Sequence, residues 1–334
     1  MNMKSFLLGA AAILATGAGA QAADAIVAAE PEPAEYVKVC DAFGKGYFYI
    51  PGSETCLSIG GYLRNDIRGG TLLGEDTSGD GKGDTWSYRT RFAMRISSAT
   101  DTEYGALKTF SEVRFNYNDN VNSNSLYISY IDLAGLRIGK DESSFMTFQG
   151  KAGGVVLDDI IPYGGYEVQL ISYTLDMGNG FSGLLAVEHT NLRNSEYVPN
   201  VVSGLKYKGD TFSASIVGAY DDHAEDGAVK ARVDGKFGNL QLFAMAGYNT
   251  GDVPNFYANW KGDWVVWGGG SYKFNDTMTS NVQLSYDEAD QFAAAADIAF
   301  KVVSGFVITP EAAYFKKASG DDRWGGVVRF QRNF

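Results

Sequence analysis

The chain is poor in several residue types, and each shortage argues against a class of protein. Only 2 Cys and 2 His occur in 334 residues, and neither His lies near the cysteines in the sequence, which argues against a zinc site. Lys and Arg total 28 against 40 Asp and Glu, so the surface lacks the positive charge that nucleic-acid binding needs. After the first 22 residues, no segment reaches the roughly 18 consecutive apolar residues of a transmembrane helix.

The first residues have the order of a secretory signal peptide. Lys4 precedes an apolar run over residues 6–16, and Ala20-Gln-Ala22 supplies the small residues of a cleavage site. The apolar run is too short to be a stable transmembrane helix. We therefore expect 1–22 to be a signal peptide that is removed after Ala22.

The two cysteines lie in the segment that follows, 23–56, which we interpret as a Pro-punctuated periplasmic lead-in. Cys40 and Cys56 are expected to form a disulfide, because the periplasm is oxidising. A metal site would need more ligands, and neither His lies nearby. Closing a loop of this length stabilises the fold by roughly 3 kcal/mol in the chain-entropy model.

Aromatic residues are abundant, with 20 Phe, 20 Tyr and 5 Trp against 7 Pro. Aromatic and β-branched runs separated by Gly, Asn and Asp clusters predict many short strands. We predict sixteen, at 57–68, 86–97, 106–117, 125–133, 135–140, 166–175, 181–190, 201–208, 211–220, 228–237, 240–249, 263–273, 277–286, 291–301, 305–315 and 324–334.

The connections between these strands alternate in length. The longer ones are 69–85, 118–124, 141–165, 191–200, 221–227, 250–262 and 316–323; the shorter ones are 134, 176–180, 209–210, 238–239, 274–276 and 302–304. Two fit poorly, since 98–105 is long for a turn and 287–290 is short for a loop. Long extracellular loops and short periplasmic turns give this alternation in an outer-membrane barrel.

The predicted strands also have two unlike faces. In 86–97, Tyr88 and Phe92 share one face, whereas Arg89 and Arg91 share the other. A soluble barrel could alternate in the same way. Together with the export signal and the loop lengths, the alternation predicts an all-β, transmembrane antiparallel β-barrel of about 16 strands over 57–334, with its apolar faces toward lipid.

The last predicted strand has the same alternation. Val328, Phe330 and Phe334 are expected to face lipid, with Trp324 near the outer rim. Arg332 falls on the same face, where an Arg costs little only close to the interface. We therefore expect this end of the strand at the periplasmic boundary.

Four segments, 39–57, 136–145, 262–269 and 324–334, resemble the alphaproteobacterial porins of the Rhizobiales or Brucella type. The resemblance spans essentially the whole chain, and 39–57 and 324–334 are its most specific parts. It implies a sixteen-stranded outer-membrane barrel, a homotrimer, passive diffusion of small hydrophilic solutes, and a long third loop folded into the lumen. The chain is short for the family, which suggests trimmed outer loops.

A diffusion pore does no chemistry but needs a narrow, wetted constriction with fixed charges. Six arginines share the polar faces of three consecutive predicted strands: Arg64, Arg68, Arg89, Arg91, Arg95 and Arg114. Same-face neighbours on a strand lie roughly 6.8 Å apart, so these residues can form a basic ladder on one wall. Alternatively they are ordinary lumen residues, or rim residues that bind lipid phosphates.

The long connection 141–165 is unusually apolar for a solvent loop and carries Asp141, Glu142, Asp158 and Asp159. Folded inward, some of these acids would face the arginines across water, and low-dielectric walls would focus the resulting field. The alternatives are a loop over the outer mouth, or a simple turn at Asp158 and Asp159.

Two other features resemble sites only weakly. Residues 76–84 resemble the start of a calcium loop, but position twelve is Ser87 and not Glu, so we favour a solvated turn and no metal. His189 and His223 lie near loop tips without a nucleophile motif, so no catalytic residue and no enzyme activity is predicted.

The sequence therefore predicts a general diffusion porin of the outer membrane, surrounded by lipid and lipopolysaccharide, with no cofactor. The main alternative is a solute-selective channel, for example for oligosaccharides, in which Tyr62 would belong to a stacking track. A barrel enzyme or adhesin without an open pore, and a soluble secreted β-protein, are less favoured.

Overall fold

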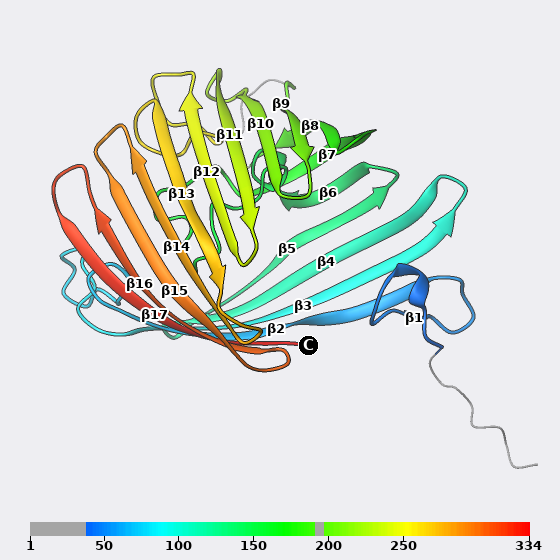
Figure 1. Ribbon diagram of the computed structural model, residues 1–334, viewed down its shortest axis with the longest axis horizontal. Helices are drawn as coiled ribbons and strands as arrows, with labels where there is room; N and C mark the ends of the chain where they lie inside the picture. Colours follow the sequence, from blue (N-terminus) through cyan, green and yellow to red (C-terminus); the bar gives the residue numbers. More distant parts are fainter. Residues whose placement is uncertain (1–37, 191–196) are drawn as a thin grey trace, which may run out of the picture. The chain divides into compact units, whose positions relative to one another are not determined.

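The computed structural model describes residues 38–190 and 197–334 (Figure 1). The signal peptide predicted for 1–22 and residues 23–37 of the lead-in lie outside the described residues. Within the described ranges, no helix is long and apolar enough to cross a bilayer. The described α-helix, α1 (Ser144–Thr147), has only four residues.

Sixteen antiparallel strands form a closed barrel, in which each strand pairs with its neighbours in the sequence and β17 pairs with β2 (Figure 1). They are β2 Cys56–Gly69, β3 Ser87–Thr102, β4 Gly105–Asn118, β5 Val121–Leu133, β6 Leu136–Glu142, β7 Glu167–Gly178, β8 Phe181–His189, β9 Asn200–Lys208, β10 Phe212–Asp221, β11 Asp226–Phe237, β12 Leu240–Asn249, β13 Trp264–Lys273, β14 Met278–Asp287, β15 Phe292–Val303, β16 Phe306–Lys316 and β17 Asp322–Asn333. The predicted all-β barrel is confirmed, and each predicted strand corresponds to an observed one.

One predicted connection is wrong. Residues 118–124 were expected to form a longer loop, but β4 and β5 are joined by Asp119 and Asn120 alone, with φ of 42° and 68°. Left-handed φ values at both positions are typical of a two-residue hairpin turn. The polar residues at the start of β5 pair with β4 although they lack an apolar pattern. The connection 98–105, which fitted poorly, also shortens to two residues because β3 extends to Thr102.

The outward positions of the strands are mostly large and apolar. Tyr88 and Phe92 of β3 are 54% and 37% exposed, as expected for a face that lies in lipid. Phe334 exchanges backbone hydrogen bonds of 2.9 and 3.1 Å with Gly61, and its ring stacks on Phe92 with centroids 6.1 Å apart. Arg332 donates to the carbonyl of Ser304 in the β15–β16 turn at 3.3 Å, which places it at the short-turn end.

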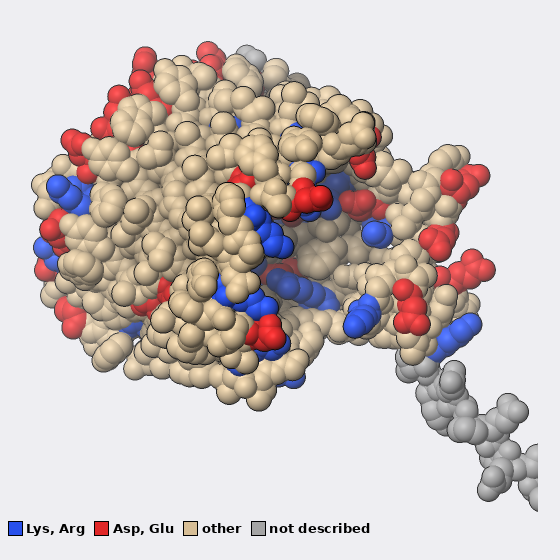
Figure 2. All heavy atoms as spheres, in the orientation of Figure 1, with Lys and Arg blue, Asp and Glu red and all other residues tan. Residues whose placement is uncertain are grey.

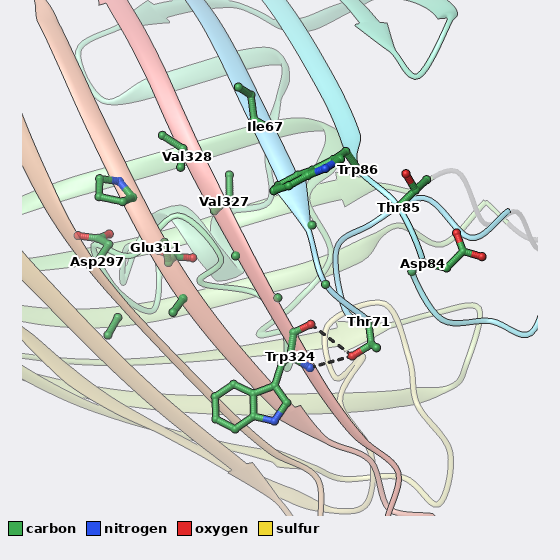
Figure 3. A pocket seen from close by; sticks show the side chains of 18 of the residues that line it. Ile67, Thr71, Asp84, Thr85, Trp86, Asp297, Glu311, Trp324, Val327 and Val328 are labelled. Atoms are coloured by element: carbon green, nitrogen blue, oxygen red, sulfur yellow. Dashed lines mark hydrogen bonds between the residues drawn. The ribbon is translucent and has the colours of Figure 1, made fainter.

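A cavity of about 990 Å³ opens where β15, β16, β17 and β2 meet near the long-loop end (Figure 3). Small residues such as Gly69, Ala312 and Gly326 line it between Trp86 and Trp324. Asp297 and Glu311 also line this cavity.

The N-terminal part of the described chain is fixed to the first barrel strand. The short strand β1 (Phe48–Tyr49) pairs with the start of β2, and Cys40 is joined to Cys56 by a disulfide with Cα atoms 6.1 Å apart. The predicted disulfide is confirmed.

The largest hydrophobic cluster lies between the inner wall and the loop that joins β6 to β7. Phe145, Met146 and Ile161 of the loop pack with Tyr257 and Trp267, all nearly inaccessible. A second, smaller cluster joins Val155 of the loop to Ala295 and Ala313. The apolar residues that look misplaced in a long loop therefore fill the lumen against the wall, which confirms that this loop folds inward. We call residues 143–166 the inward loop.

Candidate functional site

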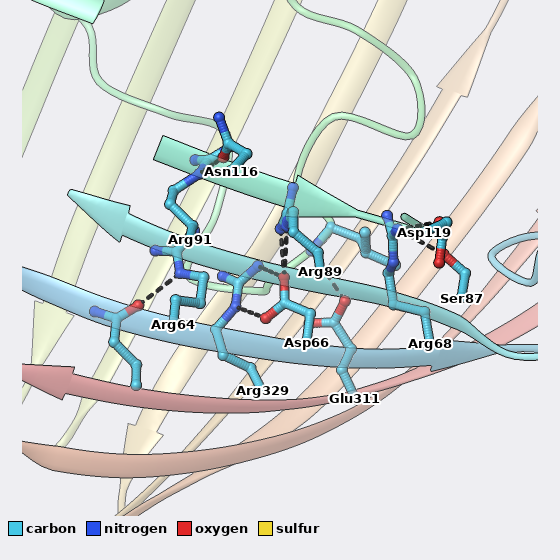
Figure 4. A network of polar contacts seen from close by, with 12 residues as sticks. Arg64, Asp66, Arg68, Ser87, Arg89, Arg91, Asn116, Asp119, Glu311 and Arg329 are labelled. Carbon is cyan, nitrogen blue, oxygen red and sulfur yellow. Dashed lines mark hydrogen bonds and ion pairs between the residues drawn. The ribbon is translucent and has the colours of Figure 1, made fainter. Parts of the chain in front are cut away.

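Three strands at the barrel closure, β2, β3 and β4, carry the predicted arginines on their lumenal faces, and β17 adds Arg329 (Figure 4). We define the charged wall as Arg64, Arg68, Arg89, Arg91, Arg95, Arg114 and Arg329 together with Asp66 and Glu112. The structure thus brings all six predicted arginines to one wall. In the space-filling view, basic side chains gather around a central hollow (Figure 2).

Two carboxylates stand inside this wall and were missed from the sequence. The Asp66 side chain is fully buried and accepts hydrogen bonds from Arg89 and from Arg329, the latter at 2.8 and 3.0 Å. Glu112 accepts from Nε of Arg95 at 2.6 Å and of Arg114 at 2.5 Å. The arginine wall is therefore two partly neutralised clusters and not an unbroken ladder of free charge.

Both acids could have been found from the sequence, because each lies two residues from an arginine and therefore on the same face of its strand. Arg329 is harder to find from sequence. It lies on the last strand, 263 residues from Asp66, and joins the wall only because β17 pairs with β2.

Arg64 and Arg91 differ from the other arginines of the wall. Arg64 donates Nε to the amide oxygen of Gln331 at 2.8 Å, and Arg91 donates Nε to that of Asn116 at 2.6 Å. Among the ion pairs of residues 38–190 and 197–334, none includes either of them. Arg68 instead donates to Ser87 at 2.6 Å and lies 3.7 Å from Asp119. The uncompensated positive charge of the wall is thus concentrated at Arg64 and Arg91.

Tyr62 does not offer a stacking surface. It is 3% exposed, and the guanidinium carbons of Arg64 and Arg95 lie 4.7 and 5.2 Å from its ring centroid. Tyr127 is likewise covered by Arg114 at 3.1 Å. The sugar-stacking track predicted for the alternative channel is therefore not formed at Tyr62.

The inward loop is held against the wall by buried polar groups. Glu188 of β8 accepts from the Ser143 hydroxyl at 2.8 Å and from the Ser144 amide at 2.6 Å. Lys230 of β11, wholly buried, donates to the carbonyl of Tyr163 at 2.6 Å. These attachments hold the loop on the side of the barrel across from β2 and β3, because β11 lies halfway around the closed sheet.

The loop tip has its own attachment. The Glu311 carboxylate on β16 accepts from the backbone amides of Val156 and Leu157, the second at 2.9 Å. Gln283 on β14 donates to the carbonyl of Asp158 at 2.7 Å. The loop tip is therefore bonded to strands close to the closure, beside the charged wall.

The four predicted acids occupy different environments. Asp141 lies in β6 and accepts from Arg137 at 2.8 Å, and Glu142 accepts from the Tyr127 hydroxyl and lies 3.5 Å from Lys151. In the inward loop, Asp158 accepts from the Tyr163 hydroxyl at 2.7 Å and Asp159 from the Tyr166 hydroxyl at 3.0 Å. None of the four forms a salt bridge with the charged wall in the part of the chain that the structure describes.

Asp158 is expected to give the channel a pH-dependent selectivity. Burial raises the pKa of Asp158 to about 6, and the charge of Asp159 adds to this rise, while the Tyr163 hydroxyl opposes it. Its carboxylate is therefore charged above this pH and neutral below it, whereas an ordinary Asp loses its charge near about pH 4. The cation-to-anion permeability ratio should fall as pH decreases through about 6.

The change is measured as the reversal potential across a KCl gradient over this pH range. Asp158→Asn should remove this component of the pH dependence, and Asp176→Asn, in the exposed β7–β8 hairpin, should leave it intact. A pH profile identical in Asp158→Asn and the parent protein would contradict the assignment.

The weaker candidates form no site of their own. In the 76–84 loop, Asp76 accepts from the amides of Gly79 and Gly81 at 2.6 Å each, and Asp84 accepts from Thr77 and Ser78. Across the described ranges, no three His, Cys, Asp or Glu side chains are grouped for a metal ion. His189 and His223 are both exposed.

Comparison with known proteins identifies relatives over the full length. A family model described as Porin subfamily matches residues 24–329. Porin Omp2b of Brucella suis biovar 1 (strain 1330) is 43% identical over 366 aligned residues, and Porin Omp2b of Brucella canis is 44% identical, each alignment covering 100% of both chains.

Solved structures share the fold at low sequence identity. The outer membrane channel DcaP of Acinetobacter baumannii superposes with a TM-score of 0.69 at 15% identity, covering 86% of this chain and 99% of that chain. A triple mutant of Rhodopseudomonas blastica porin gives a TM-score of 0.58 at 12% identity, covering 83% and 100%.

Proposed function

The chain belongs to the Porin subfamily, the Brucella-type channels of the outer membrane, and on this premise we propose that the charged wall and the inward loop form its constriction. Small hydrophilic solutes and ions diffuse passively between them. The observation that carries the proposal is the attachment of the loop across the lumen from seven arginines with only two carboxylates inside the same wall. A channel of this kind needs no catalytic residue.

The charges on the two sides are unequal in sign. The charged wall is net positive, while the inward loop contributes Asp158 and Asp159 together with Lys151. Fixed charges in a lumen with low-dielectric walls act across the water with little screening over such short distances. The resulting transverse field orients dipolar solutes and disfavours apolar ones, as expected of a general diffusion pore.

The constriction is tested by removing three arginines of the wall. The triple variant Arg89→Gln, Arg91→Gln, Arg95→Gln leaves Asp66 bonded to Arg329 and Glu112 bonded to Arg114, so the wall keeps a partner for each acid. The cation-to-anion permeability ratio should rise severalfold, measured as the reversal potential of single channels in a KCl gradient.

A matched control removes three positive charges from exposed positions, Lys45, Lys273 and Lys301, and should leave the reversal potential nearly unchanged. An unchanged reversal potential in the arginine variant would show that this wall does not line the narrowest zone. The oligosaccharide-selective alternative is not favoured by any observed feature, since the ring of Tyr62 is covered.

We also propose that the protein is a homotrimer, and the outer face of β4 to β8 supports this. A row of polar side chains, directly opposite one another in register, crosses this face: Ser111, Ser129, Lys140, Gln169 and His189. The neighbouring row on the same face is apolar, with Ile131, Ile138 and Ile171 exposed. Polar and charged groups facing hydrocarbon are costly, so this sector is expected to be covered by protein.

A bulky residue in this row should weaken the trimer. Ser111→Trp is expected to lower the temperature at which the trimer dissociates on semi-native gels, because the added ring prevents close packing. Gly218→Trp is the control, since Gly218 lies on β10, outside this row, and the atoms nearest to a side chain added there are 3.9 Å from its Cβ. Equal dissociation temperatures for the two variants would place the interface elsewhere.

A further inference from the structure

The charged wall contains a row of four side chains in direct register: Gln331, Arg64, Arg91 and Asn116 on β17, β2, β3 and β4. Arg64 and Arg91 are therefore cross-strand neighbours of like charge. Strands lie about 4.8 Å apart, and like charges directly opposite each other destabilise a sheet. A pair of this kind is stabilised when an anion lies between the two guanidinium groups.

Both guanidinium groups are held in place by neutral groups at the ends of the row. Arg64 uses its Nε for Gln331 at 2.8 Å, and Arg91 uses its Nε for Asn116 at 2.6 Å. Within residues 38–190 and 197–334, the Nη atoms of the pair donate to no side-chain acceptor. Figure 4 shows the side chains of Arg64 and Arg91 as neighbours, with Asn116 beside Arg91. The row thus presents preoriented N–H donors without a protein acceptor.

The rows on either side do not neutralise the pair. In the adjacent row, Asp66 lies between Arg89 and Arg329 and accepts from both. On the other side, Glu112 accepts from Arg95 and Arg114. Each of these carboxylates is thus shared by two other arginines, and neither bonds to Arg64 or Arg91.

We propose that Arg64 and Arg91 bind the phosphate group of a small solute, as inorganic phosphate or as a phosphomonoester, during its passage through the channel. Guanidinium groups recognise phosphate oxygens by paired, charge-assisted N–H donation, and a dianion offers one oxygen edge to each arginine. The proposal rests on the proposed function, since the solute reaches the pair through the lumen. It adds a retention step for one class of solute to a general diffusion pore.

The test uses the assembled wild-type protein in planar bilayers at mildly alkaline pH, where phosphate is mostly dianionic. Inorganic phosphate added to KCl should reduce the chloride current saturably, and glycerol phosphate should do the same whereas glycerol does not. Block by inorganic phosphate alone would limit the site to the free ion, and block by both would extend it to phosphomonoesters; either result supports the phosphate site.

Three variants make the test specific. Arg64→Gln with Arg91→Gln should raise the half-blocking phosphate concentration about tenfold or more, because two charge-assisted contacts are lost. Arg64→Lys with Arg91→Lys keeps the charge but not the planar donors, so block should weaken while the reversal potential in KCl stays close to wild type. Arg137→Gln is the control, because Arg137 lies on β6, outside the charged wall, and is paired with Asp132 and Asp141.

The outcomes separate this site from the constriction itself. If the double Gln variant shifts the reversal potential in KCl but phosphate never blocks saturably, the constriction stands and the phosphate site is refuted. If block persists unchanged in that variant, the site lies elsewhere and the proposal is refuted. If neither the reversal potential nor the block depends on these arginines, the proposed constriction fails as well. Heat-modifiable gel mobility confirms that each variant is a folded barrel.

Discussion

Replacing Glu311 with alanine is expected to release the tip of the inward loop and to increase single-channel conductance. The carboxyl group accepts two backbone hydrogen bonds, from Val156 and Leu157, and a hydrogen bond contributes about 0.5–1.5 kcal/mol. The start of the loop stays attached through Glu188 and its far side through Lys230. The tip should therefore become mobile without detachment of the whole loop, giving larger and noisier open-channel currents.

The control for this change is Glu103→Ala, the same substitution in the exposed turn between β3 and β4. It should leave both conductance and current noise as in the parent protein. Identical currents from Glu311→Ala and the parent protein would mean that the loop tip keeps its place without this carboxylate, and that packing around Val155 holds it instead.

The second large effect is expected from Asp66→Asn. The Asp66 side chain is fully buried and is shared by Arg89 and Arg329, so neutralising it leaves two arginines without their common counter-charge. Removing one member of a buried ion pair typically destabilises a protein by 3–5 kcal/mol. The variant, folded in detergent or lipid, should unfold at a lower urea concentration than the parent protein. Its channels should also become more anion-selective.

A parallel substitution, Asp132→Asn, supplies the comparison. Asp132 pairs with Arg137 at 3.0 Å, but both side chains are partly exposed, and Arg137 keeps Asp141. Pairs of this kind contribute about 0–1 kcal/mol. If Asp66→Asn were no more destabilising than Asp132→Asn, the shared carboxylate would not be a central electrostatic element of the wall.

The barrel could be predicted because its two requirements leave a signal in each strand. Outward positions must be apolar, as at Tyr88 and Phe92, and inward positions are wetted, as at Arg89 and Arg91. The turn at Asp119 and Asn120 was missed because the start of β5 is rich in Asn and Ser. Those residues belong to the sheet because they pair with β4, and pairing between strands is not visible in a local sequence pattern.

The charge balance of the site was harder to predict than its position. The six arginines were identified because they alternate with apolar residues along their strands. Their partners, however, depend on which strands become neighbours and on the register between them. Arg329 reaches Asp66 only through the pairing of β17 with β2. Likewise, the attachments of the inward loop to Glu188, Lys230 and Glu311 join positions far apart in the chain, so no sequence spacing indicates them.

The outward polar row at Ser129, Lys140 and Gln169 has a consequence for biogenesis. A solitary barrel inserted in the bilayer would present this row and the ion pair of Lys140 with Glu167 to hydrocarbon, where polar and charged groups are costly. In the proposed homotrimer that cost disappears when a neighbouring subunit covers the row. Insertion and subunit association would then be thermodynamically linked, and the stability of each barrel would depend on the local density of protomers in the membrane.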